Sequence, residues 1–485
     1  MGHGNKAHSA RACYDLQVGV WGVLAVLAAA SAAPPAWDYE VAAGPAAREL
    51  AVEARFGRAV GSALTFDEGM GAFVDAFEVA RGAEWTSVPA NGDLFLAPAC
   101  ERGPCRVRYR VRLLEAARTL ERRGVAHTNG DVVLAPPSSW LAQPLRDTGP
   151  GRYRFRVSLS AGVSFATGVF PAESDGAYEA TTEDLAQAPY SAFGPLDQVR
   201  VNAPGGAVDV AMAALSGSVS KQDVVDWVER SARAVAGYYG TFPVSRAQVI
   251  VLPGGRRSVG FGTTLGNGGA SIIVWLGPSA SRTHLERDWV LVHEMTHLGF
   301  PNVPRAQHWL EEGLATYVEP IARARAGLLP DAEVWRGLVQ GLPNGQPRAG
   351  ENGFDRTRRW GALYWGGALY WFLADLEIRE QTAGRRSVDD ALRAIRAQGG
   401  TIAVRWPLER TLETGDRATG TDVLRKLYSR LGTEGSEPID LQATWTRLGV
   451  RAEAGDVRQD DGAPLAALRR AITSGREPAA TGRTE

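Results

Sequence analysis

Two histidines with a glutamate between them are the residues of this sequence best suited to chemistry. His293, Glu294 and His297 form an H-E-x-x-H sequence. On an α-helix, with about 100° between successive residues, the two histidines lie about 40° apart on one face. Two imidazoles at this spacing can bind one Zn²⁺, and Glu294 is close enough to act on a water that the metal coordinates. Zinc lowers the pKa of such a water from about 16 to about 7, which provides a nucleophile at neutral pH.

The segment around this motif has the pattern of a buried helix. It is apolar on nearly every side, as expected for a helix inside a core. Gly299, followed by Pro301, ends the helix. The alternative is a chance match on an ordinary core helix, although the whole chain has only 7 histidines, which makes a chance match rare.

A second helical segment, 309–319, offers the third ligand. A catalytic zinc needs three protein ligands and one open position. The segment contains two neighbouring carboxylates, Glu311 and Glu312. Successive helical residues point about 100° apart, so only one of the two can face the metal. Two His and one Glu would leave one net positive charge on the site, which can polarise a carbonyl group.

This segment reads W-L-E-E-G-L-A-T-Y-V-E. It resembles the W-L-N-E-G-F-A-x-Y-x-E sequence of gluzincin metallopeptidases of the aminopeptidase N and glycyl-aminopeptidase families. In those families the Glu before Gly is the third zinc ligand, so the resemblance assigns this role to Glu312. It also implies that Glu319 supports the site from behind the ligands; the alternative is a solvated surface glutamate. The spacer between His297 and Glu312 is shorter than in aminopeptidase N, which leaves the subfamily open.

The resemblance continues at residues 364–369, Y-W-G-G-A-L, which are similar to a Y-x-K-G-A-x segment of the family. It implies that Tyr364 donates a hydrogen bond to the oxyanion as the tetrahedral intermediate forms. Preorganised donors of this kind contribute about 2.7–4 kcal/mol in the transition state. The usual Lys is Gly366 here, and the alternative is that Tyr364 is a core aromatic residue.

Gly268, Gly269 and Ala270 stand where the related enzymes place the strand edge that pairs with the substrate backbone. Glycine permits such a close approach of another backbone; the alternative is an ordinary turn before a core strand. Aminopeptidase N relatives carry a Glu in this stretch that binds the free amino terminus of the substrate. This sequence has no carboxylate there, which weakens the expectation of an exopeptidase.

Composition and periodicity predict the domain organisation. A chain of 485 residues is long enough for two or three domains. Alternation with period two predicts strands at 38–41, 106–111 and 153–159, as in a β-sandwich. A helix is expected over 221–239, buried strands over 248–252 and 271–276, and a Gly-rich loop over 255–269. Further helices are expected over 387–397, 421–431 and 462–473.

Together with the resemblance, these patterns predict an α+β protein. The expected parts are an N-terminal β-sandwich-like domain (34–195), a thermolysin-like zinc peptidase domain of mixed sheet plus helices (196–345) and an α-helical C-terminal lobe that completes the site (346–475). A disordered tail (476–485) follows. The formal net charge of −1 gives no electrostatic basis for binding nucleic acid or an anionic membrane surface.

Residues 1–33 have the pattern of a signal peptide. Lys6 and Arg11 precede an apolar run that starts at Val18, and residues 30–32 form an A-x-A cleavage pattern. The run is shorter than the about 20 apolar residues of a membrane span. An uncleaved anchor is the alternative.

Cleavage of this segment would leave two cysteines, Cys100 and Cys105. An even number of cysteines in an exported chain, around a Gly-Pro turn, favours a small disulfide-closed loop. The alternative is a pair of free thiols.

Together with the resemblance, these observations predict an exported, periplasmic or secreted, zinc metallopeptidase of the aminopeptidase-like type, with one Zn²⁺ per chain and a peptide or protein substrate. His293, His297 and Glu312 would hold the metal, Glu294 would transfer the proton, and Tyr364 would stabilise the oxyanion. Membrane insertion is not expected after cleavage of the signal. The alternatives are an endopeptidase or another zinc amide or epoxide hydrolase on the same site, and a noncatalytic peptide-binding protein. Side-chain preference and oligomeric state are not predicted.

Overall fold

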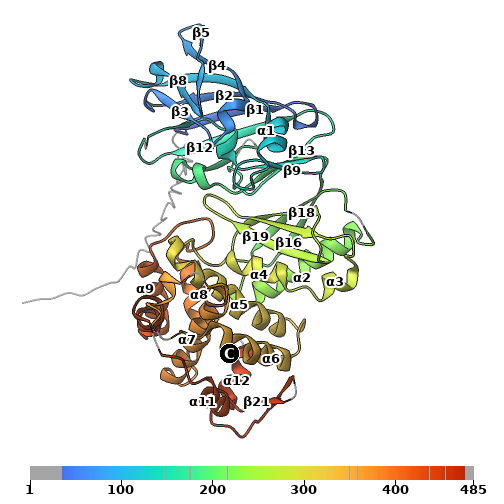
Figure 1. Ribbon diagram of the computed structural model, residues 1–485, viewed down its shortest axis with the longest axis vertical. Coiled ribbons are helices and arrows are strands. Elements are labelled where there is room, and N and C mark those ends of the chain that lie inside the picture. Colours follow the sequence, from blue (N-terminus) through green and yellow to red (C-terminus); the bar gives the residue numbers. More distant parts are fainter. Residues whose placement is uncertain are drawn as a thin grey trace, which may run out of the picture. The chain divides into compact units, whose positions relative to one another are not determined.

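The structure is a computed structural model that describes residues 35–475, apart from 147, 174, 175, 216, 349, 358, 436 and 454 (Figure 1). The predicted signal peptide (1–33) and tail (476–485) therefore lie outside the described residues. Strands predominate up to residue 276, and helices predominate after it. The α+β class, with a β-rich N-terminal part and a helical C-terminal part, is confirmed.

The first sheet has seven strands in the order β14-β12-β1-β2-β8-β4-β5. In β8 the buried residues alternate with three exposed arginines, because successive side chains of a strand point to opposite faces. The strands predicted at 38–41, 106–111 and 153–159 are confirmed as parts of β1, β8 and β12. The bounds of the seven strands are β1 (Trp37–Ala43), β2 (Leu50–Phe56), β4 (Val74–Arg81), β5 (Glu84–Ser87), β8 (Cys105–Val111), β12 (Arg152–Leu159) and β14 (Tyr178–Thr181).

Two four-stranded sheets share a hydrophobic core with the first sheet. Their strand orders are β13-β15-β10-β9 and β11-β3-β7-β6. Aromatic rings fill this core, among them the buried Tyr39, Trp140 and Phe155. The favoured disulfide is present and joins Cys100 to Cys105, the first residue of β8. The remaining elements are β3 (Ala63–Thr65), β6 (Ala90–Asn91), β7 (Leu94–Leu96), α1 (Leu113–Leu120), β9 (His127–Asn129), β10 (Val132–Ala135), β11 (Gln143–Pro144), β13 (Ser164–Thr167) and β15 (Ser191–Gly194).

A five-stranded sheet of the order β16-β17-β18-β20-β19 leads into the site. β17, β18 and β20 are parallel, and β19 pairs antiparallel with β20 at the edge. The strands predicted at 248–252 and 271–276 are confirmed. The Gly-rich loop predicted over 255–269 is wrong, because β19 lies inside it. The bounds are β16 (Asp197–Ala203), β17 (Gly206–Met212), β18 (Arg246–Pro253), β19 (Val259–Leu265) and β20 (Ser271–Leu276).

The helices enclose a second hydrophobic core. The predicted helix over 221–239 is confirmed as α2 (Lys221–Tyr239), which begins at a capping box of Ser220 and Asp223 and ends at Gly240. A π-helical turn, Ala362–Gly366, runs directly into α7. The later elements are α3 (Arg282–Glu286), α4 (Val290–His297), α5 (His308–Arg325), α6 (Asp331–Gly341), α7 (Gly367–Gln381), α8 (Val388–Ala397), α9 (Leu408–Thr419), α10 (Val423–Tyr428), α11 (Leu441–Leu448), β21 (Val450–Glu453), β22 (Asp456–Gln459) and α12 (Ala466–Ser474).

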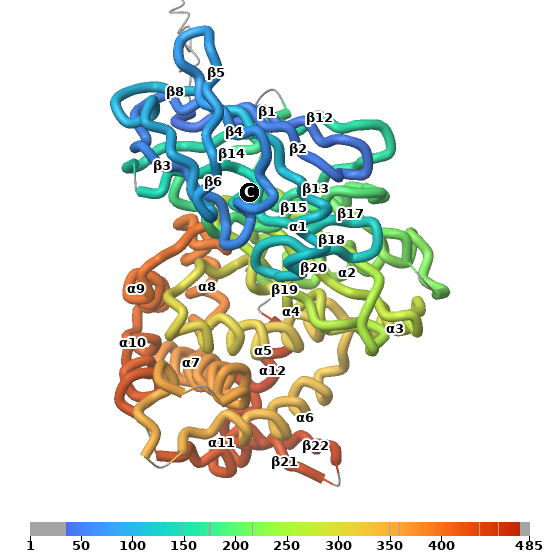
Figure 2. The backbone as a smooth tube through the Cα atoms, turned by 45° about the horizontal axis from the view of Figure 1, so that its top comes forward, coloured from blue at the N-terminus to red at the C-terminus, as the bar shows by residue number. Residues whose placement is uncertain are grey.

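Helix α4 lies between the edge strand β19 and helix α5 (Figures 1 and 2). The carbonyl oxygen of Thr296 in α4 accepts a hydrogen bond from the buried Tyr239 hydroxyl at 3.1 Å. A Cβ at Gly299 would lie 2.4 Å from the ring of Tyr239, so only glycine allows the end of α4 to pack there. The motif helix is thus held from the sheet side and from the helical side.

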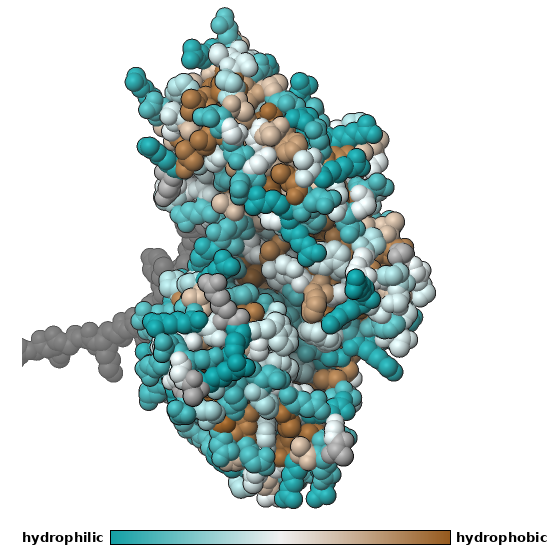
Figure 3. Space-filling model, viewed as in Figure 1, coloured by the Kyte–Doolittle hydropathy of each residue, from teal (hydrophilic) through white to brown (hydrophobic). Residues whose placement is uncertain are grey.

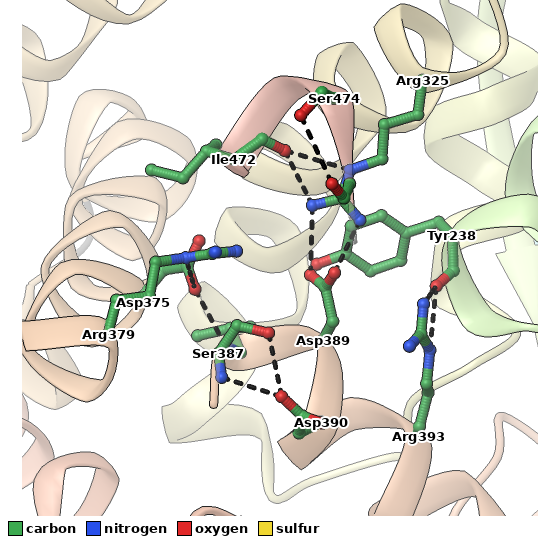
Figure 4. Close-up of polar contacts among 12 residues, drawn as sticks. Tyr238, Arg325, Asp375, Arg379, Ser387, Asp389, Asp390, Arg393, Ile472 and Ser474 are labelled. Carbon is green, nitrogen blue, oxygen red and sulfur yellow. Dashed lines mark hydrogen bonds and ion pairs between the residues drawn. The ribbon is translucent and has the colours of Figure 1, made fainter. Parts of the chain in front are cut away.

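A buried polar network joins four helices behind α5 (Figure 4). Arg325, near the end of α5, forms an ion pair with Asp389 of α8, with 2.6 Å between Nη1 and Oδ2. The same guanidinium donates from Nη2 to the carbonyl oxygen of Ile472 in α12 at 2.7 Å. Nearby, Arg379 of α7 donates to Asp375 at 2.9 Å. The network fixes the end of α5 against the C-terminal helices. An apolar side chain in place of Arg325 would leave the carbonyl oxygen of Ile472 without this hydrogen bond.

Among the helices that the structure describes, none is both long and apolar enough to cross a bilayer. The face drawn in Figure 3 is mostly hydrophilic, with smaller hydrophobic areas between the polar residues.

Candidate active site

Helix α4, which carries the H-E-x-x-H residues, starts at a carboxylate. Asp288 accepts hydrogen bonds from the backbone N–H groups of Val290 and Leu291 at 3.1 and 3.0 Å, and from the indole N–H of Trp227 at 3.0 Å. These backbone groups have no partner inside the first helical turn. Burial raises the pKa of Asp288, and the three hydrogen bonds oppose that rise. Asp288 thereby fixes the amino end of the motif helix.

His293, His297 and Glu312 come together where α4 packs against α5. One donor atom from each side chain lies within 4.8 Å of the others. Nε2 of His293 is 3.3 Å from Oε2 of Glu312, and Nε2 of His297 is 3.8 Å from the same oxygen. The structure therefore brings together the three residues that were predicted as metal ligands.

This donor set fits a zinc ion. Zinc binds imidazole nitrogen and carboxylate oxygen at about 2.0–2.2 Å, so ligand atoms of a tetrahedral site are about 3.3–3.6 Å apart. The separation of 3.3 Å lies in that range, and the separation of 3.8 Å is slightly longer. Two imidazoles and one carboxylate also leave a fourth position for water or substrate, as in catalytic zinc sites.

Two of these side chains, Glu312 and His297, are in the form that binds a cation. Burial opposes ionisation of Glu312, but hydrogen bonds with His293 and His308 hold the pKa of its carboxyl well below the usual range. Burial lowers the pKa of His297 to about 4. A metal binds carboxylate and neutral imidazole, so both side chains are in the binding form at neutral pH.

Glu294 lies beside the three donors, on the side of α4 that faces β19. Its buried carboxylate accepts a hydrogen bond at Oε2 from the hydroxyl of Thr264 at 2.6 Å. Burial raises the pKa of Glu294. A Cβ at Gly262 would lie 2.3 Å from Cγ of Glu294, so glycine is required where the strand passes this side chain. The carboxylate is therefore held between strand and helix.

His308, at the start of α5, is not among the predicted site residues. Its Nε2 lies 3.3 Å from Oε1 of Glu312, and its Nδ1 lies 2.6 Å from Oε2 of Glu311. These two hydrogen bonds raise the pKa of His308 to about 10. His308 occupies one oxygen of Glu312 and leaves the other turned toward the His pair. The spacing of three and four residues along one helix is the sequence signal for this contact.

Glu319 is buried and not a solvated surface residue. Its Oε1 accepts a hydrogen bond from Nη1 of Arg323 at 2.9 Å, and the side chain lines the same pocket as the metal-binding residues. Burial raises the pKa of Glu319 to about 7, while Arg323 opposes the rise. Its role in supporting the ligands, which the resemblance implied, stays a prediction.

Tyr364 reaches the cluster from the π-helical turn. The centroid of its ring is 6.4 Å from that of His293. Burial raises the pKa of Tyr364 to about 12, helped by the charges of Glu312 and Glu294, so the phenol keeps its proton at neutral pH. Tyr364 lines the pocket, whereas Tyr370 is the buried core residue. π-Helical turns of this kind are frequent at functional sites.

One pocket with a volume of about 590 Å³ is lined by the three candidate ligands and by Glu294, His308, Glu319 and Tyr364. Its walls are β19, α4, α5, α6 and the π-helical turn. The volume lies within the usual range for ligand pockets, roughly 300–1,000 Å³.

The sequence matches no known family model and no curated protein. Solved structures do match. An aminopeptidase N family protein from Idiomarina loihiensis has a TM-score of 0.63 at 13% identity, covering 85% of this chain and 78% of that one. A two-domain M1 zinc metallopeptidase variant bound to L-arginine has a TM-score of 0.51 at 16% identity, covering 82% and 93%. A Deinococcus radiodurans M1 zinc metallopeptidase variant bound to Tyr-Ser-Ala has a TM-score of 0.51 at 15% identity, with the same coverage. The chain has the fold of the M1 zinc metallopeptidases.

Gly268, Gly269 and Ala270 do not lie in the pocket of this M1 fold. Gly269 forms an antiparallel bridge with Val169, and the N–H of Ala270 donates to the carbonyl oxygen of Gly168 at 2.8 Å. These glycines do allow a close approach of another backbone, but that backbone belongs to the N-terminal β-rich part of the chain. The expectation that residues 268–270 form the substrate edge is therefore wrong.

The edge of the pocket is formed by β19 instead. Phe261, Gly262, Thr263 and Thr264 line it, and β19 is the last strand of its sheet. The outer backbone groups of an edge strand are available to an extended peptide. Like residues 268–270, β19 contains no carboxylate.

In this M1 fold, α5 and the start of α7 touch at glycines. A Cβ at Gly313 would lie 2.1 Å from the backbone of Gly367. Gly313 follows Glu312, and Gly367 comes three residues after Tyr364. The contact therefore sets the distance between Glu312, a candidate metal ligand, and Tyr364 in the pocket.

Gly313→Ala is expected to lower the free energy of unfolding by roughly 1–3 kcal/mol, because the added methyl group forces the helices apart. Zinc affinity should fall as well, since Glu312 moves with its helix. Gly337→Ala in α6 is the matched control: its Cβ meets no atom within 4 Å, so stability should stay equal or rise. Urea unfolding and a zinc titration measure both effects. Equal stability of the two variants would contradict the close contact.

Proposed function

We propose that this protein is a zinc-dependent metallopeptidase that hydrolyses peptide bonds. The observation that carries the proposal is the set of donor atoms of His293, His297 and Glu312 within 4.8 Å, in one pocket with the carboxylate of Glu294. A noncatalytic peptide-binding protein would have no need of Glu294 at this place. The M1 fold supports the same activity, since solved proteins of that fold are zinc metallopeptidases and one of them binds Tyr-Ser-Ala.

His293, His297 and Glu312 would hold the zinc, which when bound acidifies a water and polarises a carbonyl group. Glu294 accepts the proton of the attacking water and passes it to the leaving amine. Thr264 keeps the Glu294 carboxylate in place with its hydrogen bond. Tyr364, protonated at neutral pH, donates a hydrogen bond to the oxygen on which negative charge develops.

Chelation tests this proposal. The purified protein is expected to contain about one zinc per chain, as in mononuclear catalytic sites. Removal of the metal with 1,10-phenanthroline should abolish peptide hydrolysis and lower the thermal unfolding midpoint, and added Zn²⁺ should restore both. Metal content is measured by mass spectrometry on the same samples. A protein that hydrolyses peptides without bound metal would overturn the proposal.

One observation favours cleavage of internal or blocked peptides over trimming of free amino termini. Four carboxylates of the described chain line the pocket, and two of them serve the proposed chemistry. Glu311 faces His308 and accepts the N–H of Val303 at 3.0 Å, and Glu319 is paired with Arg323. A free amino terminus is largely cationic at neutral pH and needs an anionic partner when it leaves water.

A peptide compared with its N-acetylated form distinguishes the two activities. The blocked peptide should be cleaved at least as fast as the free one, because no uncommitted carboxylate recognises the ammonium group. If acetylation abolishes cleavage, the enzyme is an aminopeptidase on the same metal site.

We also propose that the protein is exported, because residues 1–33 have the composition of a signal peptide. Mass spectrometry of the protein from its native cells should find an amino terminus shortly after residue 32. A retained residue 1 would instead support an anchor.

A further inference from the structure

Three large aromatic side chains are exposed around the mouth of the pocket. Phe261, Trp289 and Trp360 are 64%, 42% and 67% exposed, and all three line the pocket. They come from β19, from the residue before α4 and from the segment before the π-helical turn. Grouped apolar side chains at the surface mark binding sites, because each of them is unfavourable in water.

Two of these rings lie directly against residues of the proposed chemistry. The ring of Trp289 is 5.7 Å from that of His293, and the ring of Trp360 is 5.1 Å from that of Tyr364. A peptide at these residues would therefore lie beside aromatic surfaces.

The pocket continues along α5 away from the metal-binding residues. Glu312, Thr316 and Pro320 line it at intervals of four residues, which is about 6 Å along a helix for each step. A distance of about 6 Å is close to the length of one extended side chain of a peptide bound at the candidate metal ligands. Helix α6 covers this end of the pocket.

The face of α6 toward this end is apolar and contains a gap. Val334, Gly337 and Leu338 line the pocket at helical spacings of three and four residues. Trp365 packs on the same face one turn further, where a Cβ at Gly341 would lie 2.0 Å from its ring. Between these side chains, a Cβ at Gly337 would meet no atom within 4 Å.

Packing does not require glycine at position 337. Its φ is not in the left-handed region, and glycine inside a helix is less stable than alanine. What the glycine provides is room in the pocket wall. No lysine or arginine is among the described lining residues, so the wall offers an incoming side chain apolar contact and no basic partner.

We propose that this pocket selects peptides with a large apolar side chain, aromatic or branched, beside the scissile bond. That side chain would lie over Gly337, against Leu338 and Trp365, while the rings of Phe261, Trp289 and Trp360 cover the neighbouring residues of the peptide. The proposal rests on the proposed peptidase activity and adds its substrate class.

Matched peptides that carry Phe, Leu or Ala on either side of one bond test this. The wild-type protein should cleave the Phe or Leu peptide with a kcat/KM roughly 10–200-fold above that of the Ala peptide, as apolar pockets discriminate. Gly337→Phe should remove most of this preference, so that the kcat/KM values of the Phe, Leu and Ala peptides become similar. Gly337→Ala should keep the preference.

The outcomes distinguish the proposed substrate class from the proposed peptidase activity on which it rests. If no peptide is cleaved by the zinc-loaded protein, the peptidase proposal fails. If peptides are cleaved but the wild type treats Ala and Phe alike, the substrate class is wrong and the peptidase stands. If Gly337→Phe slows both peptides equally while its thermal midpoint matches that of Gly337→Ala, the site of selection is wrong. If Gly337→Phe does not fold, the same comparison of peptides is made with Gly337→Leu and with the wild-type protein.

Discussion

Glu294→Gln is expected to reduce kcat/KM for peptide hydrolysis by roughly 10²–10⁴-fold, the usual contribution of general acid–base catalysis. The amide has nearly the shape of the carboxylate and can still accept the hydrogen bond of Thr264, which is 2.6 Å long in the native protein. It cannot take a proton from the attacking water. Zinc content and thermal midpoint should stay near those of the wild type, because Glu294 is not one of the three donors.

The matched control is Glu286→Gln, which makes the same chemical change at an exposed position where Glu286 pairs with Arg282. Its activity should equal that of the wild type. Steady-state kinetics on one peptide, with metal content measured in parallel, compares the three proteins. If Glu294→Gln keeps its activity, another group moves the proton.

Asp389→Ala is expected to lower the free energy of unfolding by roughly 3–5 kcal/mol, because it leaves a buried guanidinium without its carboxylate. Arg325 and Asp389 are 2.6 Å apart, each with a side chain 10% exposed. Arg325 also fixes the last turn of α5 to α12 through the carbonyl oxygen of Ile472. The loss of stability should therefore extend to α5, the helix that carries Glu312.

The neighbouring Asp390→Ala is the control for this variant. Asp390 accepts the N–H of Ser387 at 2.9 Å in the capping box of α8, and losing such a cap costs about 0.5–2 kcal/mol. Urea unfolding followed by tryptophan fluorescence compares the two variants. Similar losses would mean that the buried pair contributes no more than a helix cap.

The pH dependence of the pair follows from the sign of its shift. Burial opposes ionisation of Asp389, but Arg325 and Arg379 hold the pKa of its carboxyl below the usual value of 3.8. The folded protein thus binds this proton less readily than the unfolded chain. The contribution of the Arg325–Asp389 pair to the free energy of unfolding is present at neutral pH and is lost only as the pH falls below about 4.

The residues that could be predicted from the sequence are those whose chemistry depends on spacing along one element. His293 and His297 share a helix face in any α-helix, and the bounds of α2 follow from its amphipathic pattern and Gly240. Strands β1, β8 and β12 follow from alternation, since one face of their sheet is buried. Glu312 needed the resemblance, because geometry alone leaves it equal to Glu311.

The features that the sequence did not predict depend on contacts between distant segments. Strand β19 looks like a loop because three glycines interrupt it or adjoin it. The structure explains them: Cβ atoms at Gly262 and Gly266 would lie 2.3 Å from Glu294 and 1.9 Å from Ile402. Glycine here marks a strand pressed against its neighbours and not a turn. The substrate edge was wrongly expected at 268–270 because these residues stand where the related enzymes place that strand edge.

In the proposed peptidase, the absence of a side chain at position 262 would also couple substrate binding to turnover. At this position the backbone of β19 packs directly against the side chain of Glu294, and the hydroxyl of Thr264 donates a hydrogen bond to the Glu294 carboxylate. Any ligand that draws the strand outward will carry the proton acceptor with it. Substitutions in β19 should therefore change KM and kcat together. Substrate preference should be easier to change by substitutions in α6, which has no such contact with Glu294.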